Sequence, residues 1–204
     1  MVSEVRAHIA NAELVRERRR HIIESSLKLF LKRGYHSATI RELCRASGMS
    51  VGALYSYIRS KEDILRLIMD EMIEEWHTFL EGATSAGRPS EALPAAIEKY
   101  LRFMDRYQDM NLVAYREFLS LPQFISQGLT DMELNTVALF RDLVYKGCES
   151  GEFEASDGSL VAWNISIAGT MWVLKRWSLQ KQCTLEEFVR EQTELVMRSL
   201  APRK

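Results

Sequence analysis

The sequence is poor in the residues and runs that mark several common protein classes. Its 204 residues include only 10 glycines and 4 prolines, too few for a β fold with many tight turns. No apolar stretch approaches the roughly 20 residues that a membrane-spanning helix needs. The first residues include Glu4, Arg6 and Glu13 and lack the apolar run of a signal peptide. We therefore expect a cytoplasmic protein.

Cysteine and catalytic motifs are also scarce. Cys44, Cys148 and Cys183 lie far apart without CxxC spacing, which fits reduced thiols and no zinc site. The four histidines form no HExxH or HxxxH pair, and GxGxxG, P-loop and GxSxG motifs are missing. We expect no metal, no cofactor and no catalytic residues, and an enzyme is kept as the less favoured alternative.

Charge is present in both signs but is unevenly placed. Residues 1–61 hold 12 Lys/Arg and 5 Asp/Glu, a net of +7. Residues 62–204 hold 15 Lys/Arg and 23 Asp/Glu, a net of −8, so the chain as a whole carries −1. Such asymmetry indicates a basic part that meets nucleic acid and an acidic remainder. Chance clustering of charges on solvated faces is the alternative.

Apolar residues recur at helical spacing along the whole chain. The pattern predicts about nine helices, at residues 12–34, 40–46, 51–57, 61–81, 91–107, 110–121, 130–149, 159–179 and 184–200. The segment 159–179 is apolar on two faces, which predicts burial on two sides. The fold class expected is all-α, and we place a domain boundary between residues 1–60 and 61–204.

Residues 39–57 have the layout of a helix-turn-helix. Thr39 and Glu42 stand at the positions of a capping box, and Ser50 can cap the next helix. Gly48 can adopt the positive φ that a tight turn between the two helices needs. Two short helices joined in this way form the DNA-binding motif, and 51–57 would be its recognition helix.

The stretch GMSVGALYSYIRSKEDIL, from Gly48 to Leu65, resembles the DNA-binding domain of TetR-family (tetracycline-repressor-like) transcriptional regulators. So does the approach to it, GYHSATIR, from Gly34 to Arg41, and the resemblance covers about residues 16–66. Ser47 and Cys44 stand where the family usually has Ala. The resemblance implies an N-terminal three-helix DNA-binding domain followed by a helical effector-binding and dimerisation domain.

The resemblance also implies which residues meet DNA. The recognition helix would face base edges through Val51, Gly52, Ala53 and Tyr55. Arg41 would reach a base or a phosphate from the preceding helix. Contacts to phosphates are implied for Thr39, Ser50, Tyr57 and Lys61, in keeping with the way hydroxyls and helix N-termini bind phosphate oxygens. Core packing is the alternative for the two tyrosines.

A cluster of arginines precedes this motif, at Arg16, Arg18, Arg19 and Arg20. It could form an arm that reaches the adjacent groove or the DNA backbone. It could equally be a solvated face of the first helix. The sequence leaves both interpretations open.

Aromatic residues on several adjacent helices of the acidic part favour a pocket for a small apolar or aromatic effector. The candidates are Trp76, Phe79, Tyr100, Phe103, Tyr107, Tyr115, Phe118 and Phe140, with an ordinary core as the alternative. Helices 159–179 and 184–200 would form a four-helix bundle with a second copy. The candidates for that interface are Trp163, Ile167, Trp172, Phe188 and Val196.

These features together predict a dimeric, ligand-responsive DNA-binding regulator. Repression is the favoured mode, with release from a palindromic double-stranded operator when a small apolar or aromatic effector binds. An alternative is a DNA-binding protein whose helical body is a protein-interaction module without a small ligand.

Overall fold

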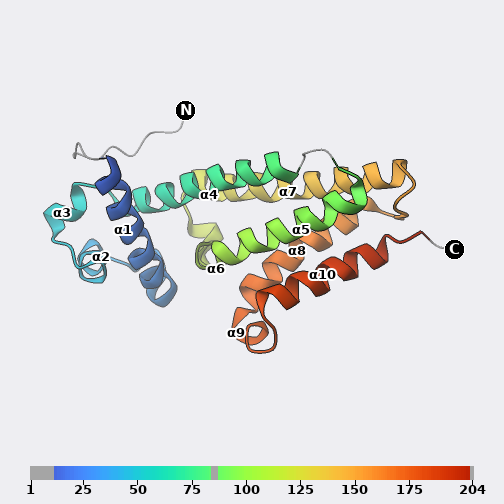
Figure 1. Cartoon of the computed structure of the whole chain (residues 1–204). Coiled ribbons are helices and arrows are strands. Elements are labelled where there is room, and N and C mark those ends of the chain that lie inside the picture. Colours follow the sequence, from blue (N-terminus) through green and yellow to red (C-terminus); the bar gives the residue numbers. More distant parts are fainter. Residues whose placement is uncertain (1–11, 84–86, 203–204) are drawn as a thin grey trace. The chain divides into compact units, whose positions relative to one another are not determined.

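The computed structural model of the chain describes residues 12–83 and 87–202. Within these ranges it contains ten α-helices, one short 3₁₀ helix and no strand (Figure 1). The all-α fold is therefore confirmed. None of the described helices has both the length and the apolar character that a membrane span requires. In the same ranges, no group of three or more His, Cys, Asp or Glu side chains is placed to hold a metal ion.

The chain forms two compact units, each built from separate stretches. The first, here called the head unit, comprises residues 1–73 and 109–128, and the second, the body unit, comprises 74–108 and 129–204. Helix α4 (Lys61–Ala83) crosses from one unit to the other. Helices α6 (Gln108–Glu117) and α7 (Gln123–Glu149) do the same. These units divide the chain at positions other than the predicted boundary between residues 60 and 61. They do not test that boundary, which stays a prediction.

The head unit contains α1 (Ala12–Arg33), α2 (Ile40–Ser47) and α3 (Val51–Tyr55), with α2 packed on both of the others (Figure 1). Its core includes the fully buried side chains of Ile22, Phe30, Leu43 and Leu54. The third helix ends at Tyr55, two residues before the predicted end. Two short helices beside a long one confirm the predicted helix-turn-helix arrangement.

Local hydrogen bonds explain where these short helices begin and end. Thr39 and Glu42 form the predicted capping box at the start of α2. Gly48 ends α2 with φ 64°, in the left-handed region that glycine adopts without strain. The Ser50 hydroxyl oxygen then accepts a hydrogen bond from the Ala53 N–H at 3.2 Å and caps α3. The turn is thus set by three residues that the sequence identifies.

The body unit is built from α5 (Pro89–Arg106), α8 (Gly158–Leu174), α9 (Arg176–Leu179), α10 (Leu185–Ser199) and the adjoining parts of α4 and α7. Helix α5 packs against α8 and α10 (Figure 1). A Cβ atom on Gly169 of α8 would lie 2.8 Å from the Tyr100 side chain of α5. The absent side chain therefore lets these two helices approach closely.

Two predicted helices differ from those observed. Helix α7 begins at Gln123, directly after Pro122, rather than near residue 130. Gly128 lies within it, and a Cβ there would come 2.9 Å from the Met69 methyl carbon, so this glycine serves close packing and does not end a helix. The predicted helix 159–179 is divided at Lys175, where φ is −104° and ψ is 12°. That division accounts for the tenth helix.

Candidate nucleic-acid interface

Helix α3 presents several side chains at the surface of the head unit. Val51 is 48% exposed and Tyr55 44% exposed. A Cβ on Gly52 would meet no atom within 4 Å, and Ala53 is half-buried. Val51 and Tyr55 are four positions apart, so they lie on the same face of α3. The four residues expected to face base edges therefore lie together on one short helix.

The N-termini of α2 and α3 hold the two hydroxyl residues expected at phosphates. Ser50 uses its oxygen as an acceptor for Ala53 N–H, and its O–H can donate outward. Thr39 is more engaged, because its hydroxyl donates to a Glu42 carboxylate oxygen at 2.9 Å and accepts from Glu42 N–H at 3.3 Å. Hydrogen bonds from Thr39, its backbone N–H first, hold the pKa of Glu42 below its usual range. Both hydroxyls lie at the surface.

Tyr57 and Lys61 are placed differently from the phosphate contacts that the resemblance implied. Tyr57 is only 7% exposed, so its ring belongs to the core of the head unit. The Lys61 ammonium donates to the carbonyl oxygens of Tyr35 and His36, both at 2.9 Å, and of Ala38 at 3.4 Å. It also lies 4.5 Å from the Tyr35 ring centroid. Lys61 therefore holds the loop between α1 and α2.

Helix α2 presents a basic residue that the sequence analysis did not single out. Arg45 is exposed and follows Arg41, also exposed, by four positions. Residues at this spacing lie on the same helix face. The spacing itself was a signal available in the sequence, and it places two positive charges on one exposed face of α2.

The arginine cluster lies on α1 and not on an extended segment. Arg18 and Arg20 are exposed, while Arg19 is partly buried. Successive residues of a helix point in different directions, so the three side chains do not share one face. An arm formed by residues 1–11 would lie outside the residues that the structure describes.

The end of α1 is fixed to the last turn of α6 within the head unit. The Tyr35 N–H donates to a Glu117 carboxylate oxygen at 2.6 Å. Arg116 donates to the Leu31 carbonyl at 2.9 Å, which satisfies an unpaired acceptor near the C-terminus of α1. His36 Nε2 lies 2.7 Å from the Ser120 carbonyl, and it must be the donor because a carbonyl only accepts. We call Arg116, Glu117 and Ser120 the α6 clasp.

The candidate effector residues fall into two groups. Six are buried in the body unit: Trp76, Phe79, Tyr100, Phe103, Tyr107 and Phe140. The other two, Tyr115 and Phe118, belong to the head unit and are 45% and 42% exposed. The structure brings the first six together in one compact unit.

The candidate dimer residues also divide by burial. Trp163 and Ile167 are exposed on α8, and Val196 is half-buried on α10. Trp172 and Phe188 are buried, and their ring centroids lie 4.8 Å apart. These two rings pack inside the body unit, so they do not present a surface to a second copy. The prediction that α8 is buried on two sides is met on one face only in the single chain.

A helix-turn-helix whose third helix is exposed is the layout of DNA-binding transcriptional regulators. Two family models match the chain. "Bacterial regulatory proteins, tetR family" matches residues 22–68, and "Tetracyclin repressor-like, C-terminal domain" matches residues 86–200. The chain belongs to the TetR family, whose members are ligand-responsive regulators and not enzymes.

Three similar proteins illustrate the relationship. The HTH-type transcriptional regulator HbdR of Aromatoleum sp. (strain CIB) is 30% identical, over 92% of this chain and 82% of its own length. The HTH-type transcriptional repressor KstR2 of Rhodococcus jostii (strain RHA1) is 27% identical, over 78% of this chain and 79% of its own. The structure of AibR in complex with isovaleryl coenzyme A and operator DNA has a TM-score of 0.71 and 19% identity, and the match covers 87% of this chain and 97% of AibR.

Proposed function

We propose that this regulator is a homodimeric repressor that leaves a palindromic operator when it binds a small effector with an apolar or aromatic group. The observation that carries the proposal is the exposed α3, with Val51, Gly52 and Tyr55 at the surface of the head unit. The sequence of this part is basic, with a net of +7 over residues 1–61. A positive surface is attracted to DNA phosphates whatever the sequence.

The proposed DNA contacts begin at the N-terminus of α3. Val51 and Ala53 meet thymine methyl groups, Tyr55 and Gly52 approach base edges, and Arg41 reads a guanine. Ser50, Thr39 and the N-termini of α2 and α3 contact phosphates. Because Val51 and Ala53 cannot hydrogen-bond a base through their side chains, few bases are recognised by hydrogen bonds. DNA shape therefore contributes to the choice of operator. Tyr57 and Lys61 support this surface from inside the head unit.

The proposed dimer uses the exposed apolar face of α8 and α10. Trp163, Ile167 and Val196 lie there, joined by Leu160, Met171 and Leu195, which are 59%, 36% and 62% exposed. Apolar surface of this extent on adjacent helices marks an interface. Two copies related by a twofold axis would pair these helices in a four-helix bundle. Two heads spaced by about one DNA turn would then read a palindrome.

The proposed effector contains an apolar or aromatic group because the body unit carries six clustered aromatic side chains. AibR is described with isovaleryl coenzyme A and operator DNA, and this supports coenzyme A thioesters as the first compounds to test. The effector acts through α4, which runs from Lys61 in the head unit to Trp76 in the body unit. Only a ligand that binds one conformation better than another changes operator affinity.

An operator-binding assay tests this function. We expect operator fragments selected from genomic DNA to contain an inverted repeat and to bind at nanomolar concentration. A cell metabolite extract should weaken that binding, and sedimentation should show a dimer at micromolar concentration. If extracts and thioesters leave the DNA affinity unchanged, the body is a protein-interaction module instead. If no DNA is selected, the proposal is wrong.

A further inference from the structure

Helix α9 and the residues that follow it connect α8 to α10 within the body unit (Figure 1). We call residues 175–183 the α9 turn. The backbone N–H groups of residues 178–183 each donate to a carbonyl three or four positions earlier, at 2.8–3.2 Å. These distances are those of well-formed hydrogen bonds, so the α9 turn presents its side chains on an ordered backbone.

The largest side chain of the α9 turn is left in water. Trp177 is 67% exposed, whereas Trp172, five positions earlier, is 2% exposed and donates to an Asp105 carboxylate oxygen at 2.7 Å. Among the described residues, the Trp177 indole has neither a hydrogen-bond partner nor a ring contact. An indole combines an apolar ring with one polar N–H, and it is therefore favoured where an apolar medium meets water.

The charges of the α9 turn are all positive. Lys175 and Lys181 are exposed, and neither forms an ion pair with a described residue, while Arg176 is half-buried. Residues 158–185 contain no Asp or Glu, although residues 62–204 as a whole carry a net charge of −8. The α9 turn is therefore a positive patch on the acidic part of the chain.

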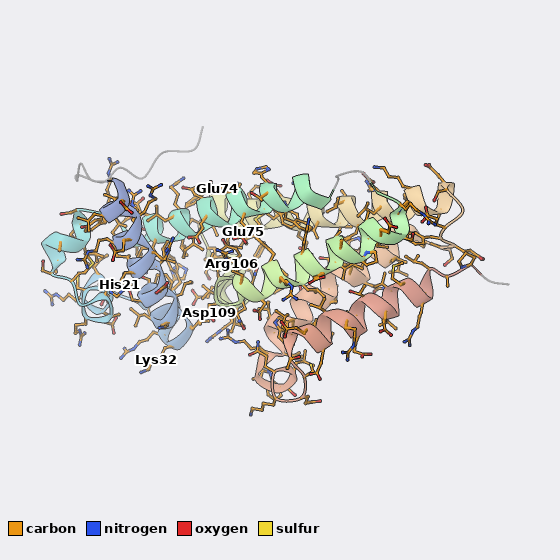
Figure 2. All side chains as sticks on the ribbon, in the orientation of Figure 1. His21, Lys32, Glu74, Glu75, Arg106 and Asp109 are labelled. Carbon is orange, nitrogen blue, oxygen red and sulfur yellow. The ribbon has the colours of Figure 1, made fainter. Side chains whose placement is uncertain are left out.

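Arginines elsewhere in the body unit contrast with these two lysines. Arg106 pairs with Glu75 at 2.8 Å, and both residues are labelled in Figure 2. Arg102 pairs with Glu98 at 3.0 Å and with Glu186 at 3.3 Å. Because the lysines of the α9 turn have no such carboxylate, their charge is available to a negatively charged partner.

The small size of the patch limits the kind of partner that it fits. A stable protein interface buries about 800 Å² and involves about 20–30 residues on each side, more than one turn with a single exposed large apolar side chain can supply. Duplex DNA would attract the lysines but leave the ring unused, because its base faces are already stacked. An anionic membrane uses both features, since basic residues and an interfacial Trp each contribute at its surface.

We infer that the α9 turn is a docking surface for an anionic phospholipid membrane. Trp177 enters the headgroup region, and Lys175 and Lys181 contact the negative groups of the lipids. The contact is peripheral and reversible, because it includes few charges and one ring. It goes beyond the proposed function and does not rest on it, since neither operator binding nor effector binding was assigned to these residues.

Vesicle binding by the full chain is the first test. The probes are vesicles of phosphatidylcholine with about 30% phosphatidylserine, which carry a negative surface potential, and vesicles of phosphatidylcholine alone. At low ionic strength we expect the protein to sediment with the anionic vesicles and not with the neutral ones, and added salt should release it. A protein that binds neither kind of vesicle would overturn the inference.

Tryptophan emission shows whether the α9 turn makes the contact, because the basic head can also attract anionic vesicles. Anionic vesicles should shift the emission to shorter wavelength as the Trp177 indole leaves water. Trp177→Phe should abolish this shift. Trp172→Phe is the control, since it removes a buried indole and should keep the shift. If the shift persists in Trp177→Phe, another tryptophan enters the membrane and the inference is wrong.

The two lysines are tested by removing one charge at a time. Lys175→Gln and Lys181→Gln should each weaken binding to anionic vesicles about 5-fold, the factor that corresponds to about 1 kcal/mol per basic residue at such a surface. Lys146→Gln makes the same change at an exposed position of α7 and should bind like the wild type. Equal losses for all three variants would show that only net charge matters, contrary to the inference.

Operator binding distinguishes this inference from a DNA contact and from the proposed function. Trp177→Ala should bind operator DNA like the wild type, and a marked loss would place the α9 turn at DNA instead of at a membrane. If the wild-type protein binds no operator but Trp177 still enters anionic vesicles, the proposed function is wrong and the membrane contact remains.

Discussion

At the scale of single residues, the position of Lys61 changes what its charge does. The family resemblance implied a phosphate contact, yet three backbone carbonyls surround the ammonium. Hydrogen bonds from a charged donor are stronger than neutral ones. The charge therefore stabilises the loop that precedes α2, and it supports the DNA-binding surface indirectly.

We expect Lys61→Met to lower the free energy of unfolding by about 1–3 kcal/mol, because three carbonyls lose a charged donor. The slope of log K against log salt for operator binding should stay unchanged. Lys146→Met, which removes an exposed lysine of the body unit, is the control and should leave stability unaltered. Urea denaturation and a salt titration check both points, and a slope that falls by about 1 would show that Lys61 contacts a phosphate after all.

Arg41 and Arg45 share a face of α2 but are expected to differ in effect. Arg41→Ala should cost about 1–3 kcal/mol of operator binding and relax specificity at one base pair, as loss of a guanine contact does. Arg45→Ala should weaken binding to all sequences alike and flatten the salt dependence. Fluorescence anisotropy with operators mutated at single positions distinguishes the two. A uniform loss for both variants would remove the base contact from Arg41.

At the scale of elements, caps and turns were the most predictable features. Thr39, Glu42, Gly48 and Ser50 act through neighbours in sequence, so their roles could be predicted without knowledge of the fold. The start of α7 could not, because Gly128 is explained by contact with Met69, far away in the chain. The burial of Tyr57 and the engagement of Lys61 likewise depend on which loops pack against them.

The two positive-φ glycines of the head unit offer a paired prediction. Gly48 has φ 64°, and a Cβ added there would meet no atom within 4 Å, so Gly48→Ala should cost only backbone strain, about 1–2 kcal/mol. Gly34 has φ 84° and its Cβ would lie 2.8 Å from a Glu117 oxygen. Gly34→Ala should therefore cost about 1–3 kcal/mol more, because Glu117 must release Tyr35 N–H. Thermal unfolding measures both, and equal losses would contradict a role for the clasp.

The capping box of α2 predicts a pH dependence. The pKa of Glu42 is lowered in the folded protein by hydrogen bonds from Thr39, so ionised Glu42 stabilises the fold above its unfolded pKa of about 4.3. That stabilisation is lost as pH falls through the lowered folded value. Glu42→Gln keeps an acceptor for the cap and should flatten the fall of the unfolding temperature between about pH 5 and 3.

Glu187 provides a second test, since it forms the same capping box with Thr184 at the start of α10 and its pKa is lowered for the same reason. Glu187→Gln should flatten the acid dependence in a similar way. If neither substitution changes the acid profile, the carboxylates do not contribute through their charge.

At the scale of the whole molecule, the sequence predicted the division of labour between a basic head and an acidic body. It also predicted that α8 and α10 carry apolar surface, but it could not tell which residues face outward. Trp172 and Trp163 look alike in a hydrophobic pattern, and only the packing of α5 and α10 against α8 decides that the first is buried. That the exposed apolar face of α8 and α10 binds a second copy of the chain is still a proposal.

Charge placed on that exposed face should separate the proposed dimer. Ile167 is 52% exposed on α8, and Leu134 is 53% exposed on α7. Ile167→Asp should give a monomer in sedimentation velocity at micromolar concentration and lower operator affinity, because two heads no longer bind together. Leu134→Asp, matched in exposure and chemistry, should remain a dimer. If both variants sediment like the wild type, the interface lies elsewhere.

The loop between α1 and α2 is held from two sides, by Lys61 at the start of α4 and by the α6 clasp. These two helices enter the head unit from different points of the chain. If α4 and α6 move together, these hydrogen bonds can stay intact. If one helix slides past the other, hydrogen bonds at Tyr35 or His36 must break. The loop would then be sensitive to relative motion of the two helices and insensitive to motion that they share. It lies directly before α2, the helix that precedes α3.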